Sequence, residues 1–188
     1  MVTTALMTAD ELLRLPDDGF HKYELVRGEL TTMAPPGFEH GSDALALAGP
    51  MRQFVRQHRL GRVVVETGFI LEHDPDTVRG PDVAFVSADR LPPPERREKY
   101  FDGAPDIAVE VVSPGDTAFE VQQSPVGKPL VREYLDAGSK LVWVLYPRAR
   151  NVMVHRGDGT AQLLREGDMI SGEDVVPGFS LAVDELFE

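Results

Sequence analysis

Two short apolar runs that each carry one acidic residue constrain the fold of this chain most strongly. Asp82 directly precedes the run at residues 83–86, and Glu110 lies inside the run at residues 107–112. Runs rich in β-branched residues are typical of buried strands. A charged carboxylate in such a strand costs free energy unless a metal, a proton or a partner compensates it. The pair therefore predicts a metal site held by two strands.

Strand alternation gives both acids apolar neighbours. Residues two apart share a face of a strand, so Glu110 shares one with Ala108 and Val112, and Asp82 shares one with Ala84. The alternative is that the two acids form ordinary ion pairs at strand ends, which also place carboxylates in such positions. The residues alone leave both interpretations open.

Length and composition predict one globular domain over residues 1–188. The chain is long enough for a self-sufficient core, and 42% of its residues are hydrophobic. It has no cysteine, which excludes disulfides, thiolate metal ligands and a cysteine nucleophile. No cationic leader and no apolar stretch of about 20 residues is visible. We therefore expect a cytoplasmic protein without membrane association.

The formal net charge of -12 argues against a protein that coats nucleic acid by charge alone. A nucleic-acid enzyme with this balance would need a local basic surface. The predicted helix at residues 40–60 offers one, because Arg52, Arg56 and Arg59 lie on a face away from its apolar residues. They either bind phosphates or form a solvated helix face.

The pattern along the chain predicts an α/β fold of the α+β type. Thr8 and Glu11 form a capping box before a short helix, and Arg27 with Gly28 marks the turn of a hairpin over residues 23–33. A helix near residues 130–135 and a buried strand at 141–145 indicate a crossover. The remaining predicted elements are a long helix at 40–60, a meander of strands at 62–65, 67–71, 83–86 and 107–112, and a C-terminal β-hairpin at 152–164.

Several motifs together resemble one known family. They are YELVRGEL at 23–30, GPDVAFV at 80–86, PDIAVEVVSPGDT at 105–117, YLDAG at 134–138, VWV at 142–144 and VPGFS at 176–180. On these stretches the chain resembles the Uma family, which belongs to the PD-(D/E)XK restriction-endonuclease-like superfamily. The resemblance extends from residue 8 to residue 187.

The resemblance implies a restriction-endonuclease-like core, in which a central mixed β-sheet is flanked by helices. It also implies an acidic site that binds Mg²⁺ or Mn²⁺, and hydrolysis of phosphodiester bonds in DNA. Carboxylates are the natural ligands of such hard cations. Asp82 and Glu110 would be the ligands here.

The catalytic lysine is the point at which the chain departs from the family. The superfamily pattern places a lysine two residues after the glutamate, where this chain has Val112, and the Uma family moves it to a position that is Leu130 here. The nearest lysine is Lys128, inside a stretch at 124–129 that has the character of an insertion. Lys128 either assists catalysis or caps the following helix, since Pro129 suits a first helical position.

Two further residues are candidates for the site. Glu24 is a candidate ligand or water-orienting acid, and its alternative is an exposed hairpin acid paired with Lys22 or Arg27. His40 matches a family position and is a candidate for contacting nucleic acid or moving a proton, although a hydrogen bond at the helix start is the more frequent role. Trp143, among apolar neighbours, is expected in the core.

Three functions follow from these observations. The first is a Mg²⁺- or Mn²⁺-dependent endonuclease that cleaves DNA. The second is a catalytically weakened nuclease fold that binds nucleic acid or a protein, which the displaced lysine favours. The third is a hydrolase of small phosphodiesters, which the acidic composition favours. Apolar edge strands are compatible with a homodimer.

Overall fold

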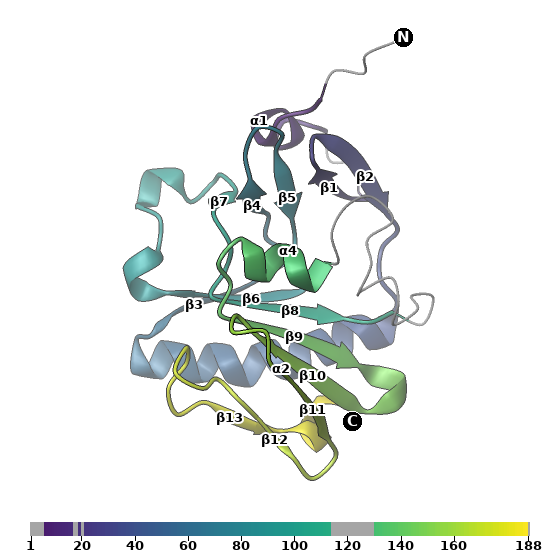
Figure 1. Cartoon of the computed structure of the whole chain (residues 1–188), viewed down its shortest axis with the longest axis vertical. Helices are drawn as coiled ribbons and strands as arrows, with labels where there is room; N and C mark the ends of the chain where they lie inside the picture. Colours follow the sequence, from purple (N-terminus) through teal and green to yellow (C-terminus); the bar gives the residue numbers. More distant parts are fainter. Residues whose placement is uncertain (1–5, 17–18, 20, 114–129, 188) are drawn as a thin grey trace.

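The computed structural model describes residues 6–16, 19, 21–113 and 130–187, and Lys128 lies outside them. Its strands form two main sheets that share no strand, and a small hairpin at the C-terminal end (Figure 1). The first sheet has the strand order β2-β1-β5-β4-β7, and the second has the order β11-β10-β9-β8-β6-β3. The sequence predicted a single meander for strands that the structure divides between two sheets.

The six-stranded sheet contains both acidic runs. Its strands are β3 (Gly61–Val65), β6 (Val83–Ser87), β8 (Ile107–Val111), β9 (Leu141–Tyr146), β10 (Asn151–Arg156) and β11 (Ala161–Arg165). β8 and β9 pair in parallel, and the other neighbours pair antiparallel. The parallel pair needs a connection that crosses the sheet, and α4 (Leu130–Asp136) is part of it. The predicted mixed sheet and crossover are both confirmed.

One face of this sheet packs against α2 (Phe38–His58). Leu47, Met51 and Val55 recur at helical spacing and are fully buried against the inward residues of the strands. Trp143 belongs to the same cluster and is completely buried, as predicted. The helix ends at His58, and Arg59 adopts the left-handed conformation that commonly closes a helix.

The opposite face carries α4 and the acidic residues. Val131 and Tyr134 of α4 pack on Ala108, Val142 and Val144. Ala84 and Val86 on the same face of β6 contact the five-stranded sheet through Phe69. This second face is therefore the floor on which a site between the two sheets can form.

The five-stranded sheet contains the predicted hairpin, β1 (Lys22–Val26) and β2 (Glu29–Met33). Arg27 and Gly28 both have positive φ at its turn, as two-residue hairpins require. The sheet continues with β5 (Thr77–Arg79), β4 (Phe69–Glu72) and β7 (Phe101–Asp102). α1 (Ala9–Leu12) packs on it, and its capping box of Thr8 and Glu11 is confirmed.

The C-terminal part contains the predicted hairpin of β10 and β11, followed by β12 (Met169–Ser171) and β13 (Ser180–Ala182). Four short 3-10 helices complete the described elements: Ala88–Arg90, Pro94–Arg96, Pro147–Ala149 and Val183–Leu186. Within the described residues, no helix has the length and apolar character needed to cross a membrane.

Candidate functional site

Asp82 and Glu110 lie next to each other on the face of the six-stranded sheet that is opposite α2. β6 and β8 pair with Val83 opposite Val109, so continuing the register places Asp82 opposite Glu110. The Val111 backbone N–H donates to Asp82 Oδ2 at 2.7 Å, which fixes that carboxylate against β8. The two acidic runs therefore deliver their carboxylates to one place, as the alternation of each strand predicts.

Glu110 is held from the other side by α4. The Tyr134 hydroxyl donates to Glu110 Oε1 at 2.8 Å, and the Tyr134 side chain is fully buried. Burial and the nearby Asp82 carboxylate raise the pKa of Glu110 well above its usual range. A cation placed between these two acids would relieve this electrostatic cost.

His40 contacts Asp82 from the start of α2. Its Nε2 lies 3.0 Å from Asp82 Oδ1, and its Nδ1 lies 3.1 Å from Ser113 Oγ just after β8. The hydrogen bond and charge of Asp82 raise the pKa of His40 despite partial burial of the ring. His40 therefore ties the start of α2 to the Asp82 carboxylate and to Ser113 just after β8.

His40, Glu66 and Asp82 fit a metal ion. One ligand atom from each lies within 4.8 Å of the others. Glu66 follows β3 in a turn with a φ of 49°, and its side chain is 49% exposed, so it can adjust to a ligand. Carboxylates suit Mg²⁺ and Mn²⁺, whereas imidazole is typical of transition metals. The set therefore combines ligand types suited to a divalent cation.

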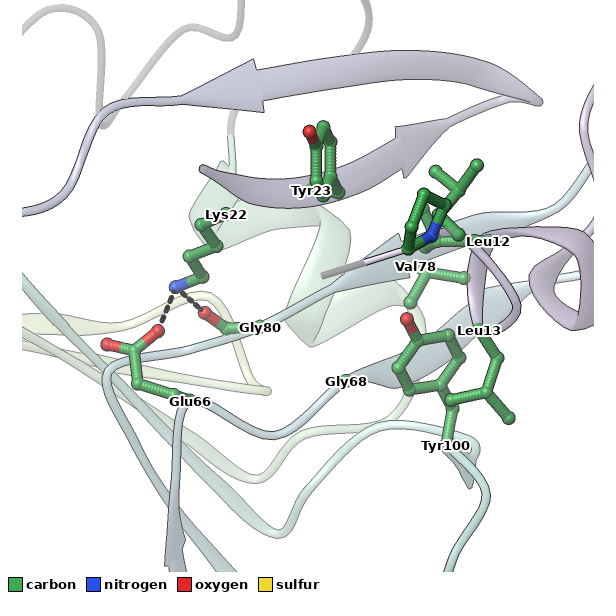
Figure 2. Close-up of a pocket in the computed structure, with 11 residues that line it drawn as sticks. Leu12, Leu13, Lys22, Tyr23, Glu66, Gly68, Val78, Gly80 and Tyr100 are labelled. Carbon is green, nitrogen blue, oxygen red and sulfur yellow. Dashed lines mark hydrogen bonds and ion pairs between the residues drawn. The ribbon is translucent and has the colours of Figure 1, made fainter. Parts of the chain in front are cut away.

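Lys22 brings a positive charge to this cluster from the other sheet. Its ammonium lies 2.8 Å from Glu66 Oε2 and also donates to the Gly80 carbonyl (Figure 2). Burial alone would lower the pKa of Lys22, but the charges of Glu110, Glu66 and Asp82 raise it. A Cβ on Gly80 would lie 3.1 Å from Lys22 Cε, so glycine there leaves room for the lysine side chain.

Glu24 is also buried beside the site, but both of its oxygens are already bonded. Oε1 accepts the Gly80 N–H at 2.8 Å, and Oε2 pairs with Arg79 Nη1 at 2.9 Å. Arg79 Nε in turn pairs with Glu133 of α4 at 2.7 Å. This chain of contacts joins the hairpin, β5 and α4 behind Asp82 and Glu110. The exposed ion pairs considered for Glu24 in the sequence are replaced by a buried one.

The comparisons with known proteins agree with this architecture. A family model described as "Putative restriction endonuclease", Uma2, matches residues 9–184. The chain belongs to the Uma2 family. A crystal structure of "a putative nuclease belonging to DUF820" from Anabaena variabilis ATCC 29413 has a TM-score of 0.80, 21% identity, and coverage of 96% of this chain and 97% of that chain. At that identity the likeness shows the fold alone. A search of curated proteins gives no match.

The structure separates the predicted residues of this Uma2 member into two groups. It brings together Asp82, Glu110, Glu24 and His40. It does not bring Arg52, Arg56 and Arg59 to them, because these exposed residues lie 12 or more positions beyond His40 on the same helix, about 18 Å or more along its axis. Their nucleic-acid role stays a prediction.

Sequence reasoning missed Lys22, Glu66 and Arg79 as parts of the site. Lys22 entered only as a surface partner of Glu24, although its place directly before the predicted hairpin, two residues from Glu24, was a usable signal. Glu66 lies in a turn that carries no motif. Arg79 belongs to β5, a three-residue strand too short to be recognised between a proline turn and Gly80.

Proposed function

We propose that this Uma2 member is a metal-dependent endonuclease that hydrolyses phosphodiester bonds in DNA. The observation that carries the proposal is the position of Asp82 opposite Glu110, with His40 and Glu66 close enough to Asp82 to share one cation with it. Family membership favours the same reaction. Structural ion pairs do not explain the arrangement well, because burial and a like charge both oppose ionisation of Glu110.

The chain's own residues would perform three tasks. Asp82 and Glu110 would hold the metal, with His40 and Glu66 as further ligands. A bound Mg²⁺ or Mn²⁺ supplies Lewis-acid stabilisation of charge on the phosphate. Tyr134 and the Val111 N–H keep the two carboxylates in place, and the pair of Glu24 and Arg79 supports them from behind. Preorganised partners of this kind lower the cost of reaching the transition state.

Lys22 is our candidate for the positive charge that the superfamily lysine provides. Its raised pKa keeps it charged at neutral pH, and its side chain is 27% exposed, so a phosphate can reach it. An ammonium beside the carboxylates offsets their repulsion of the phosphate and stabilises charge that develops on it. Lys128, in the segment outside the described residues, remains the alternative.

Isothermal titration of Mn²⁺ is the first test. We expect one strong site in the wild type and its loss in the double variant Asp82→Ala, Glu110→Ala. Glu29→Ala is the matched control, because Glu29 is an exposed acid at the other end of the same hairpin. Absence of Mn²⁺ binding at millimolar concentration in the wild type would contradict the proposal and leave the binding-protein alternative.

Cleavage is the second test. We expect Mn²⁺-dependent cleavage of DNA oligonucleotides that the double variant loses and Glu29→Ala retains. The net charge of -12 favours a second candidate function, hydrolysis of small phosphodiesters. Turnover of bis(p-nitrophenyl) phosphate without cleavage of any oligonucleotide would select that function.

A further inference from the structure

A cavity of about 390 Å³ lies between α1, β1 and β5, next to the acidic site (Figure 2). Leu12, Leu13 and Val78 form its apolar part, and the side chains of Tyr23 and Tyr100 lie on two sides of it. Its size is near the lower end for pockets that hold small organic ligands, about 300 to 1,000 Å³. The lining combines aliphatic contacts with aromatic rings, which suits a flat aromatic group.

The residues at the other end of the cavity connect it to the acidic site. Lys22 and Glu66 line this end, and Glu66, like His40, can share a metal with Asp82. Lys22 has three N–H donors, of which the contacts to Glu66 and the Gly80 carbonyl use two. A phosphate bound at the acidic site therefore has a charged donor on the cavity side, and its attached nucleoside has an adjoining cavity with an apolar and aromatic part.

Gly68 fixes the position of the aromatic wall. A Cβ on Gly68 would lie 2.3 Å from Tyr100 Cδ1 and 2.5 Å from Cε1, closer than atoms can approach. The Tyr100 ring therefore packs against backbone at a distance that only glycine allows. The cavity depends on this contact, because a side chain at position 68 would push the ring from its place.

We propose that this cavity binds the base of an unpaired nucleotide whose phosphate lies at the acidic site. The inference rests on the proposed function and specifies its substrate. Stacking on aromatic rings is sequence-tolerant and requires a base that is out of the duplex. A chain with a net charge of -12 is poorly suited to follow a long duplex by charge, so a pocket for one base supplies binding that charge does not.

The test combines abasic substrates with variants of the aromatic wall. Single-stranded oligonucleotides with one defined cleavage site and one abasic position, moved stepwise past that site, are cleaved in Mn²⁺ and bound in Ca²⁺. We expect one position adjacent to the scissile phosphate at which base removal slows wild-type cleavage and weakens binding about tenfold, the scale of one stacking contact. Duplex substrates should be cleaved more slowly than single strands.

Tyr100→Ala and Gly68→Ala should each lower cleavage and binding of the intact substrate about tenfold. Removing that base from the substrate should cause no further loss in these variants. Tyr100→Phe keeps the ring and should behave as the wild type. Leu30→Ala, which removes an exposed apolar side chain of β2 outside the cavity, is the control. Thermal unfolding checks that each variant is folded, and the abasic series on the wild type decides the matter if Tyr100→Ala is not.

Two results would overturn the inference. If wild-type cleavage is insensitive to every abasic position, or if the Tyr100→Ala and abasic losses multiply, the cavity does not hold a base while the nuclease function stands. If the wild type neither binds nor cleaves any nucleic acid, the proposed function fails, and this inference fails with it.

Discussion

One acid lies directly before β8 and another near its end, and the contrast between their partners separates a structural role from a candidate functional one. Asp106, directly before β8, is fully buried and surrounded by compensating partners. Its carboxylate lies 2.9 Å from Lys140 Nζ and 3.1 Å from Arg90 Nη1, and it accepts the Ser87 N–H at 2.9 Å. Although burial raises the pKa of Asp106, these partners together hold it below its usual value.

Glu110, four residues after Asp106 and inside β8, has mostly like charges around it. Its nearest charged neighbours include the carboxylates of Asp82 and Glu24, opposed by Lys22, and the pKa of Glu110 is raised. Asp106 directly precedes the apolar run that contains Glu110, so nearness to that run does not distinguish the two acids. The charges around each acid do distinguish them. The charge of Asp106 is compensated by cations of the protein, whereas the charge of Glu110 is opposed by neighbouring carboxylates and needs a further cation.

The largest effect should come from Glu110→Gln, which keeps the acceptor for Tyr134 but removes the charge. We expect Mn²⁺-dependent cleavage to fall about 1,000-fold, since metal ligation supplies several kcal/mol of transition-state stabilisation. The free energy of unfolding in EDTA should rise by about 1 kcal/mol, because repulsion from Asp82 is relieved. Urea titration measures it, and a less stable variant would place Glu110 in the same class as Asp106.

Lys22→Cys should reduce cleavage about 100-fold, the scale of losing one electrostatic stabiliser. Because the chain has no cysteine, the new thiol is the only one and can be alkylated with 2-bromoethylamine, which rebuilds an ammonium at the same reach. We expect alkylation to restore most of the activity. Lys99→Cys, at an exposed surface lysine, is the control. Full activity before alkylation would return the role to Lys128.

Asp106→Asn should show the reverse pattern of Glu110→Gln. Loss of the charge leaves Arg90 and Lys140 without their partner, and we expect the free energy of unfolding to fall by about 2 kcal/mol, typical of hydrogen bonds to charged groups. Cleavage under conditions where the variant is folded should stay within about twofold of the wild type. A large loss of activity in a folded variant would break the distinction between the two ends of β8.

The smallest effect should be the pH dependence of the stability difference between the wild type and Asp106→Asn. The folded-state pKa of Asp106 is lowered, so its stabilising contribution is complete above the unfolded value near 4 and is lost as pH falls through the folded value. The stability gap between wild type and Asp106→Asn, measured by urea unfolding, should therefore shrink by about 1 kcal/mol between pH 7 and pH 3. A gap that widens would mean that Asp106 is not stabilised by its partners.

Sequence periodicity predicted the structural features that depend on residues close together in the chain. The hairpin turn at Arg27 and Gly28 and the buried stripe of α2 follow from residues near each other in the chain. Strand alternation also predicted the face of each acid within its own strand, but the register that sets Asp82 opposite Glu110 comes from the pairing of β6 with β8. The division of strands between two sheets also depends on which strands pair. Lys22 reaches Glu66 from another sheet, across a distance of 44 residues that no local pattern encodes.

The residues of the candidate site come from distant parts of the chain, and this affects when the site forms during protein synthesis. Lys22 and Glu24 emerge first from the ribosome, Asp82 and Glu110 follow, and Tyr134, which secures Glu110, comes much later. A growing chain therefore holds an incomplete candidate site until α4 is made. The proposed nuclease would gain its activity only after most of the domain is synthesised, without any separate inhibitor.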